Sequence, residues 1–395
     1  MYRKFTASHI FTGTTLLTGG YVLITTKDGS IIDLLPEKDA GDAVEKYNGI
    51  LCPGFINTHC HLELSHLKNT IPEKTGLVDF VFAVMTQRGF DTEIILKAIQ
   101  NAEDEMLQNG ILAVGDICNT ADTIQQKLKG RLYYHNFIEV AGFVPAAAAS
   151  RFNTASELWT QFQAMNNGQR ATIVPHAPYS VSPQLFELIN SFAGNNLVSM
   201  HNQESLQEDI FFKTGTGNFL KLYEKLNIDI SFYKPGGKSS LQTVLPYFNK
   251  NQSLILVHDV TTTTDDIKAV KQATVNHQLS TVFFCLCPNA NLYISNMLPD
   301  MNTLVSSDCT IVLGTDSLAS NHQLSILEEM KTLHKHFPQL PLQTVLQWAT
   351  FNGAKALQLD NKLGSFEKGK QPGVVIIENA DDLVLGEKSV VKRII

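Results

Sequence analysis

Histidines recur directly after apolar runs of the sequence, where their side chains could meet around a metal ion. His59 and His61 are separated by one residue and follow the run 51–58. Because alternate residues of an extended chain share a face, both imidazoles could bind the same ion. His201 and Asp316 follow two further apolar runs. Such a nitrogen-rich set with one carboxylate would suit a catalytic zinc with a position left open for water.

Three more polar residues occur in comparable positions. His176 and His258 also follow apolar runs, and Glu204 lies three residues beyond His201. Any single histidine of this kind could be a packing residue, and Glu204 could be a first-turn residue favoured by the helix dipole. Their recurrence after successive apolar runs favours one shared site, in which Glu204 would act as general acid and base.

These side chains need a scaffold that brings the ends of the apolar runs together. Runs of strand character alternate with helical stretches, which indicates parallel βα units. The expected strands are 51–58, 111–117, 133–140, 171–175, 197–200, 253–257, 280–285 and 310–313. The expected helices are 92–108, 156–166, 183–192, 264–277, 323–336 and 342–356. Eight strands are the number in a (β/α)8 TIM barrel, whose active sites lie at the carboxyl ends of the strands.

Both ends of the chain carry short apolar runs of their own. Residues 10–52 are punctuated by glycine-containing turns, and residues 373–377 and 389–391 again have strand character. We therefore expect an α/β protein in which residues 53–361 form the barrel. Residues 1–52 and 362–395 would together form a small β-sandwich-like domain.

Composition restricts the partners. The formal net charge of −7 provides no basic surface for nucleic acid or an anionic membrane. No uncharged apolar run reaches transmembrane length. The six cysteines lie among apolar runs and resemble reduced core thiols, which favours a cytoplasmic location. We expect a small-molecule substrate and neither a nucleic-acid nor a membrane partner, and the sequence leaves homodimer formation open.

Other metal and phosphate motifs are absent. The chain has no His-Glu-x-x-His and no Pro-Cys-x-x-Cys of the cytidine-deaminase type. Residues 235–239 look superficially like a phosphate loop, but Phe232 occupies the position of the required first glycine. This segment is interpreted as a turn before a helix.

The motifs taken together resemble the amidohydrolase superfamily, in its branch of aminohydrolases and chlorohydrolases that act on nitrogen heterocycles. The resemblance spans nearly the whole chain. It is carried by the segment 53–61 (Pro-Gly-Phe-Ile-Asn-Thr-His-Cys-His), by His176-Ala177-Pro178, His201-x-x-Glu204 and His258, by Cys287-Pro288-x-x-Asn291, by 313–317 (Leu-Gly-Thr-Asp-Ser) and by Ala349-Thr350-x-Asn352-Gly353-Ala354.

The resemblance implies roles for individual residues. The metal ligands would be His59, His61, His201 and Asp316. His258 would contact the water on the metal, His176 the substrate, and Glu204 would transfer protons, with Asp316 accepting the proton of the water. Binuclear relatives use a carboxylated lysine at the end of the fourth strand, and residues 171–178 contain no lysine. One divalent ion per chain is therefore expected, zinc by preference and Fe²⁺ as the alternative.

Substrate contacts would come from the loops after the strands. Candidates besides His176 are Glu63, His135 and Glu139, and a lid containing Phe80, Phe82 and Arg88. The segment 61–65 is similar to that of 6-aminodeoxyfutalosine deaminases, which implies hydrolytic deamination of an adenine nucleoside-like substrate. Guanine, cytosine or another cyclic amidine stay open. So do two other functions: hydrolysis of a ring carbon–chlorine bond or a cyclic amide, and a non-catalytic assembly role, against which the complete ligand set argues.

Overall fold

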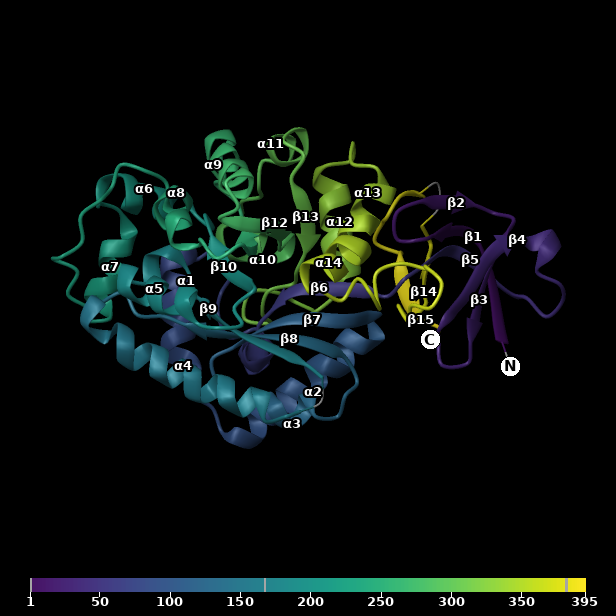
Figure 1. The fold of residues 1–395 in the computed structure, drawn as a ribbon, viewed down its shortest axis with the longest axis horizontal. Helices are drawn as coiled ribbons and strands as arrows, with labels where there is room; N and C mark the ends of the chain where they lie inside the picture. Colours follow the sequence, from purple (N-terminus) through teal and green to yellow (C-terminus); the bar gives the residue numbers. More distant parts are fainter. Residues whose placement is uncertain (1, 167, 381–382) are drawn as a thin grey trace.

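Two parallel four-stranded sheets form the centre of the molecule (Figure 1). The computed structural model describes residues 2–166, 168–380 and 383–395. The first sheet has the order β6-β7-β8-β9, with β6 Phe55–Cys60, β7 Ile111–Cys118, β8 Tyr133–Val140 and β9 Arg170–Pro175. The second has the order β10-β11-β12-β13, with β10 Leu197–Asn202, β11 Gln252–His258, β12 Leu279–Leu286 and β13 Thr310–Leu313.

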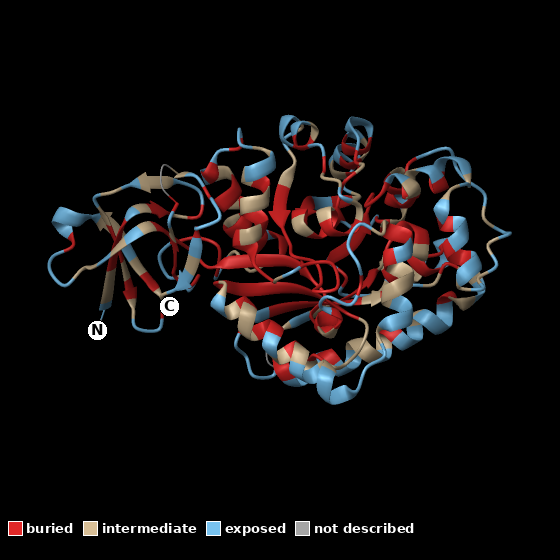
Figure 2. Ribbon diagram, turned by 180° about the vertical axis from the view of Figure 1, so that it is seen from behind, coloured by how far each residue is buried: buried red, intermediate tan, exposed pale blue. Residues whose placement is uncertain are grey.

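The central strands are buried on both faces, as parallel strands covered by helices require. Every residue of β6, β7 and β10 is buried, and Figure 2 shows this buried centre beneath helices with exposed outer faces. Gly115 lets β7 approach β6 closely, since a Cβ at this position would lie 2.3 Å from the carbonyl oxygen of Thr58. Close packing of these two strands fixes the backbone that carries the first histidine pair.

Backbone contacts also join the outer strands of the two sheets. The amide of His201 on β10 donates to the carbonyl oxygen of His176, directly after β9, at 2.9 Å. On the other side, Cys60 of β6 and Asp316 after β13 form a parallel bridge. The carboxyl ends of β6, β10 and β13 therefore lie together.

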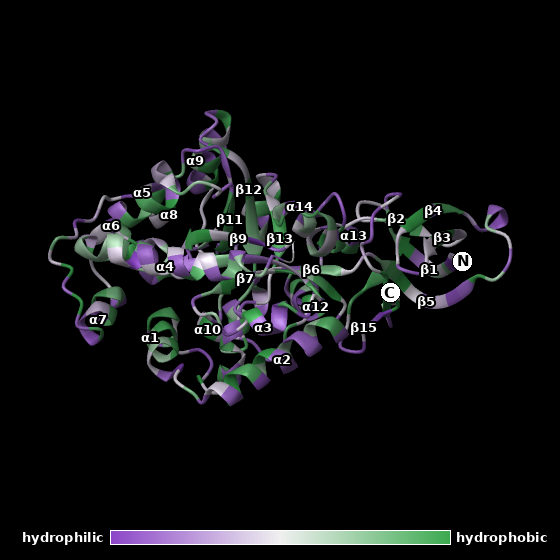
Figure 3. Ribbon diagram, turned by 60° about the horizontal axis from the view of Figure 1, so that its bottom comes forward, coloured by the Kyte–Doolittle hydropathy of each residue, from purple (hydrophilic) through white to green (hydrophobic). Residues whose placement is uncertain are grey.

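Helices follow most of the strands and cover the sheets (Figure 1), and their mixed hydropathy is visible in Figure 3. They are α1 Leu77–Gln87, α2 Thr92–Gln108, α3 Ile124–Lys127, α4 Ala148–Gln163, α5 Pro183–Ser191, α6 Leu206–Thr214, α7 Asn218–Lys225, α8 Ser240–Val244, α9 Thr264–Val275, α10 Pro288–Ser295, α11 Met301–Ser306, α12 Ile326–His336, α13 Leu342–Gln347 and α14 Gly353–Ala356. In the part of the chain described, no helix is both long and apolar enough to span a membrane.

Local capping explains where several helices begin. Ser182 accepts a hydrogen bond from the amide of Leu185 and precedes Pro183, so it caps the start of α5. Ser239 does the same for the amide of Gln242 at the start of α8. The segment 235–239 is thus the turn before a helix that its residues predicted.

The two ends of the chain meet in one further sheet of seven strands. Its strands are β1 Tyr2–Phe11, β2 Leu16–Thr18, β3 Tyr21–Thr26, β4 Ile31–Pro36, β5 Glu45–Cys52, β14 Val375–Glu378 and β15 Val390–Arg393. β14 pairs antiparallel with β5, with Ile376 opposite Leu51, so the two ends lie side by side (Figure 1). The side chains of Phe5, Leu23, Leu51 and Ile376 are buried in its core.

Most expected elements differ from the observed ones by a few residues at their ends, and three differences are larger. The expected strand 51–58 is divided, because β5 ends at Cys52 and β6 begins at Phe55. Pro53 has no amide to donate, and the amide of Gly54 donates to the carbonyl oxygen of Pro372. The helix expected at 156–166 begins at Ala148 and ends at Gln163. The helix expected at 342–356 contains a π-helical segment at Trp348–Asn352.

Candidate metal centre

Four buried side chains converge at the carboxyl ends of β6, β10 and β13. They are His59, His61, His201 and Asp316, and one ligand atom from each lies within 4.8 Å of the others. The Nε2 atom of His61 lies 3.2 Å from Nε2 of both His59 and His201. Oδ1 of Asp316 lies 3.3 Å from Nε2 of His61 and 3.5 Å from Nε2 of His59. The structure thus brings together all four ligands expected from the sequence.

These separations fit one divalent metal ion. A tetrahedral zinc with bonds of about 2.0–2.1 Å to its ligands separates the ligand atoms by about 3.3 Å. The Nε2 atoms of His59 and His201 both face Nε2 of His61. Because Nε2 of His61 carries at most one proton, it cannot donate a hydrogen bond to both of the other rings. A cation at their common centre would satisfy them and the carboxylate together.

The protonation states of these residues also favour metal binding. Burial lowers the pKa of His61 to about 4 and lowers that of His201 well below its usual range. Burial opposes ionisation of Asp316, but a hydrogen bond with His59 and the nearby charges of His61 and His258 outweigh it and lower its pKa. Neutral imidazoles and an ionised carboxylate are the protonation states that metal ligands need.

The backbone around Asp316 is shaped to reach the histidines. Gly314 packs so closely against His59 that a Cβ would lie 2.8 Å from the Cβ of the histidine. The amides of Thr315 and Asp316 both donate to the carbonyl oxygen of His59, at 3.0 and 3.1 Å. Asp316 itself has φ of +57°, and His258 has φ of +81°. Positive φ values at non-glycine residues are uncommon and concentrate at functional sites.

Two hydrogen bonds from residues outside the ligand set orient His201 and Asp316. Nδ1 of His201 lies 2.9 Å from the carbonyl oxygen of His176, which leaves Nε2 directed at the centre. The hydroxyl of Ser320 donates to Oδ2 of Asp316 at 2.5 Å, which leaves Oδ1 facing the histidines. Such outer contacts fix the orientation of metal ligands.

Glu204 and His258 lie next to each other beside the ligands. Oε1 of Glu204 is 3.6 Å from Nε2 of His258. Nδ1 of His258 lies 2.8 Å from Oδ1 of Asn291, so this nitrogen is the donor and Nε2 is left with its lone pair. Burial, helped by the charges of Asp316 and Glu208, raises the pKa of Glu204 well above its usual value. The carboxyl group of Glu204 can therefore hold a proton at neutral pH.

Glu208 supports the backbone that carries Glu204. Its two carboxylate oxygens accept from the amides of Gln203 and Glu204, each at 3.2 Å. Gln203 has φ of +47°, and its side chain donates to Asp266 at 3.0 Å. Burial raises the pKa of Glu208 to about 7.

His176 and Glu139 form a second group around His201. Glu139, His176 and His201 offer atoms within 4.8 Å of one another. Oε1 of Glu139 lies 3.5 Å from Nδ1 of His201, and Nδ1 of His176 lies 2.7 Å from the hydroxyl of Ser180. Both residues expected to contact substrate thus lie next to a metal ligand.

Glu63 is occupied by protein groups. Its carboxylate pairs with Arg88 at 2.8 Å and accepts from the amides of Asn119 and Thr120 at 2.9 Å. Arg88 follows α1, a helix that contains Phe80 and Phe82, where a lid was expected. The structure places Glu63 just after the first histidine pair. Its Oε2 accepts three hydrogen bonds from Asn119 and Thr120, and its Oε1 pairs with Arg88.

His135 needs a correction, because it does not lie in a loop after its strand. It is the third residue of β8, four positions before Glu139, which corresponds to a rise of about 13 Å along the strand. Its ring stacks on Phe137 at 4.6 Å, and its Nε2 lies 3.2 Å from the hydroxyl of Thr172. The structure therefore leaves His135 near the amino ends of the strands, away from the metal ligands.

Several supporting residues were not identified from the sequence. Besides Ser320 and Glu208, a buried pair of Asp116 and Lys127 lies beneath the site, with Nζ to Oδ2 at 2.5 Å. Asn291 belongs to a motif noted in the sequence, but its contact with His258 was not predicted. The other oxygen of Asp116 accepts from the amide of Leu62, directly after His61, at 2.8 Å. The available signal was the single charge of Asp116 within the apolar run 111–118, since a buried charge needs a partner.

The family model of the amidohydrolase family matches residues 50–393. An adenosine deaminase of Helicobacter pylori is 27% identical over 332 residues, which cover 82% of this chain and 78% of that protein. An aminodeoxyfutalosine deaminase of Nitratiruptor sp. is 26% identical, covering 90% of this chain and 87% of that protein. A solved structure of Helicobacter pylori aminofutalosine deaminase with methylthio-coformycin superposes with a TM-score of 0.85 at 22% identity, over 100% of both chains.

Proposed function

The chain belongs to the amidohydrolase family, and we propose on this premise that it deaminates an aminopurine nucleoside by hydrolysis. The observation that carries the proposal is the convergence of His59, His61, His201 and Asp316 beside Glu204 and His258. Related proteins that act as adenosine and aminodeoxyfutalosine deaminases support the choice of reaction.

The four ligands would hold one divalent ion, with zinc preferred by three imidazoles and one carboxylate. When bound, such an ion activates water for attack on an electrophilic carbon. Asp316 would accept the proton of the water at its carboxylate. Its hydrogen bond from Ser320 keeps the acceptor oriented.

Glu204 would then move a proton to the substrate. Its raised pKa lets it hold a proton at neutral pH, and a protonated carboxyl can donate to the ring nitrogen next to the reacting carbon. His258, oriented by Asn291, presents the lone pair of Nε2 toward the same place and would accept a hydrogen bond from the attacking water. Asp316 would pass the proton taken from the water to the amino group of the substrate, so that the carbon–nitrogen bond breaks and ammonia leaves. The proton of the new hydroxyl group would return to Glu204 as the oxo product forms.

The substrate class we infer is an adenine nucleoside, such as adenosine, 5'-deoxyadenosine or aminodeoxyfutalosine. His176 and Glu139 are the best placed substrate contacts, since both lie beside His201. Glu63 could act only through an oxygen lone pair that its protein donors leave free. His135 lies outside this proposal, because β8 positions it at the opposite end.

We propose a two-domain architecture for a protein with this function. We propose that the two parallel sheets close into one (β/α)8 barrel over residues 53–361, supported by the bridge between Cys60 and Asp316. Residues 1–52 and 362–395 would form the composite β domain.

The six cysteines carry no disulfide, which supports a reducing location such as the cytoplasm.

An assay of the metal-loaded protein tests the proposal. Adenosine, 5'-deoxyadenosine and aminodeoxyfutalosine are each supplied, and ammonia release is measured together with formation of the hydroxy product. A chlorinated triazine and a cyclic amide serve as comparison substrates for the alternative functions. Release of ammonia from at least one adenine nucleoside is expected. Chloride release or ring opening without deamination would replace the proposal with a chlorohydrolase or cyclic amide hydrolase, and no reaction with any compound would favour a non-catalytic role.

A further inference from the structure

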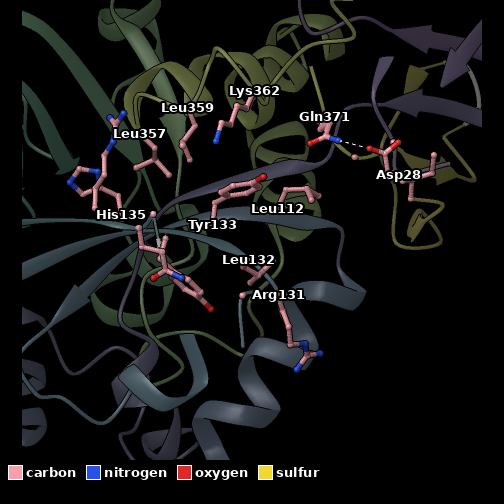
Figure 4. A pocket seen from close by; sticks show the side chains of 18 of the residues that line it. Asp28, Leu112, Arg131, Leu132, Tyr133, His135, Leu357, Leu359, Lys362 and Gln371 are labelled. Carbon is pink, nitrogen blue, oxygen red and sulfur yellow. Dashed lines mark hydrogen bonds between the residues drawn. The ribbon is translucent and has the colours of Figure 1, made fainter. Parts of the chain in front are cut away.

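A second pocket lies at the amino ends of β7, β8 and β9. Leu112, Tyr133 and Arg170, from the first residues of these strands, line it together with Lys362 and Arg393 (Figure 4). Its volume is about 370 Å³, within the range of sites for small ligands. The metal ligands follow the carboxyl ends of the strands, so this pocket is separate from the metal centre.

Positive charge gathers at this pocket in a chain whose formal net charge is −7. Arg131, Arg170, Lys362 and Arg393 line it, and the carboxylate among the lining side chains is that of Asp28. Asp28 accepts a hydrogen bond from Gln371 at 2.9 Å at the outer edge of the pocket (Figure 4). A concave surface lined mainly by one sign of charge attracts the opposite charge.

Among the described residues, Arg170 and Lys362 have no anionic partner, and Arg393 has no Asp or Glu partner. Arg131 is paired with Asp104 at 2.6 Å. By contrast, Arg170 donates to the side-chain oxygen of Gln358 at 2.8 Å, and Lys362 lies 5.8 Å from the ring centre of Tyr133. Arg393 donates to an oxygen of Ile395 at 3.0 Å. Within the described ranges, no Asp or Glu side chain lies at ion-pair distance from these three cations.

Two neighbouring cations are paired instead. Lys392, next to Arg393, pairs with Glu378 at 2.7 Å, and Lys370 pairs with Glu367 at 2.9 Å.

The inner wall supplies apolar and aromatic surface. Leu112, Leu357 and Leu359 line the pocket, and the Tyr133 side chain lies among them (Figure 4). His135, which is 2% exposed, also lines the pocket, and its Nδ1 atom has no hydrogen-bond partner. A flat apolar body would pack against these side chains, while a charged group would meet the cations.

We propose that this pocket binds a small organic anion, with a planar or apolar body and a phosphate or carboxylate group. Arg170 and Arg393 would contact the anionic group as planar donors, and Lys362 as a point charge. Because the lining residues come both from the parallel strands and from the terminal sheet, the ligand would bridge these two parts of the molecule.

Calorimetric titration of the metal-loaded protein with phenyl phosphate at fixed ionic strength tests the proposal. Saturable binding of about one molecule per chain is expected, and Arg170→Gln and Lys362→Gln should each weaken it about tenfold. Both side chains are exposed, so both variants should fold. Arg170→Lys should recover part of the binding. Lys221→Gln, a change of an exposed cation on α7 away from the pocket, should leave binding unchanged.

Further titrations identify the ligand chemistry. Phenol, which lacks the anionic group, should bind far more weakly, and inorganic phosphate, which lacks the ring, should also bind less tightly. Tighter binding of phenyl phosphate than of phthalate would assign a phosphate monoester, and the reverse order a dicarboxylate. Absence of saturable binding of either anion would overturn the proposal. So would binding that survives both the Arg170→Gln and the Lys362→Gln changes, because it would then occur at another place such as the metal centre.

Discussion

Oε1 of Glu204 lies 3.6 Å from Nε2 of His258, and both side chains are buried beside the four metal ligands. The contact combines a carboxyl group whose pKa burial raises with an imidazole whose pKa burial lowers to about 4. Both shifts favour a proton on the carboxyl group rather than on the ring. This is the arrangement that a proton donor to a ring nitrogen requires.

Replacing Glu204 by Gln should remove this donor without changing the size of the side chain. We expect kcat for deamination to fall by about 10²- to 10⁴-fold, the usual contribution of general acid–base catalysis. Metal content, measured by plasma mass spectrometry, should stay the same. Glu187→Gln, on the exposed face of α5, is the matched control. Unchanged turnover in Glu204→Gln would remove this residue from the mechanism.

Replacing His201 by Asn should remove one of the four metal ligands. The metal content of the purified variant should drop below that of the unchanged protein, because three side chains hold the ion less tightly than four. His277→Asn is a suitable control, since His277 is exposed with φ of +56°, a conformation that Asn accepts. Full metal content in the His201→Asn protein would show that His201 is not a ligand.

Ser320 is expected to act through Asp316. Its hydroxyl donates to Oδ2 of the aspartate at 2.5 Å, and loss of such an outer contact typically weakens metal binding about 10- to 100-fold. Ser320→Ala should therefore release its metal at a lower chelator concentration in a competition titration. Ser306→Ala, at an exposed position on α11, should behave like the unchanged protein. Identical release curves for Ser320→Ala and the control would reduce this hydrogen bond to a packing contact.

Glu208 should make stability depend on pH. Burial raises its pKa in the folded chain from 4.5 to about 7, so the folded protein keeps a proton that the unfolded chain loses. Its stabilising contribution is fully present below pH 4.5 and declines as the pH rises from 4.5 to about 7. From pH 5 to pH 7, the free energy of unfolding should fall by about 2 kcal/mol more in the unchanged protein than in Glu208→Gln.

Urea unfolding at the two pH values measures this difference. Parallel pH dependence of the two proteins would mean that Glu208 is ionised in the folded state, held by the amides of Gln203 and Glu204.

The ligands were predictable because each follows an apolar run at a strand end. His59, His61, His201 and Asp316 lie where parallel strands bring their carboxyl ends together, so local sequence was sufficient. The contacts that support the ligands could not be predicted, because they join residues that are distant in the sequence. Asn291, for example, is 33 residues from His258. Spacing along one chain carries no information on such pairs.

The errors have similarly local causes. The run 51–58 has apolar residues on both sides of Pro53 and Gly54, but these two residues lie between two different sheets. The pairing of Leu51 with Ile376 involves the opposite end of the sequence and leaves no pattern near either residue. His135 was assigned to the end of a strand whose bounds were correct, although its place near the start of β8 directs it to the second pocket.

Metal removal and reconstitution tests the central claim most directly. The protein is stripped with a chelator, titrated with zinc, and assayed for ammonia release from the adenine nucleoside that the intact protein deaminates. We predict negligible activity in the stripped protein and full recovery at one zinc per chain, as the cluster of His59, His61, His201 and Asp316 requires. Full activity without metal, or recovery that needs two ions per chain, would contradict the mononuclear site.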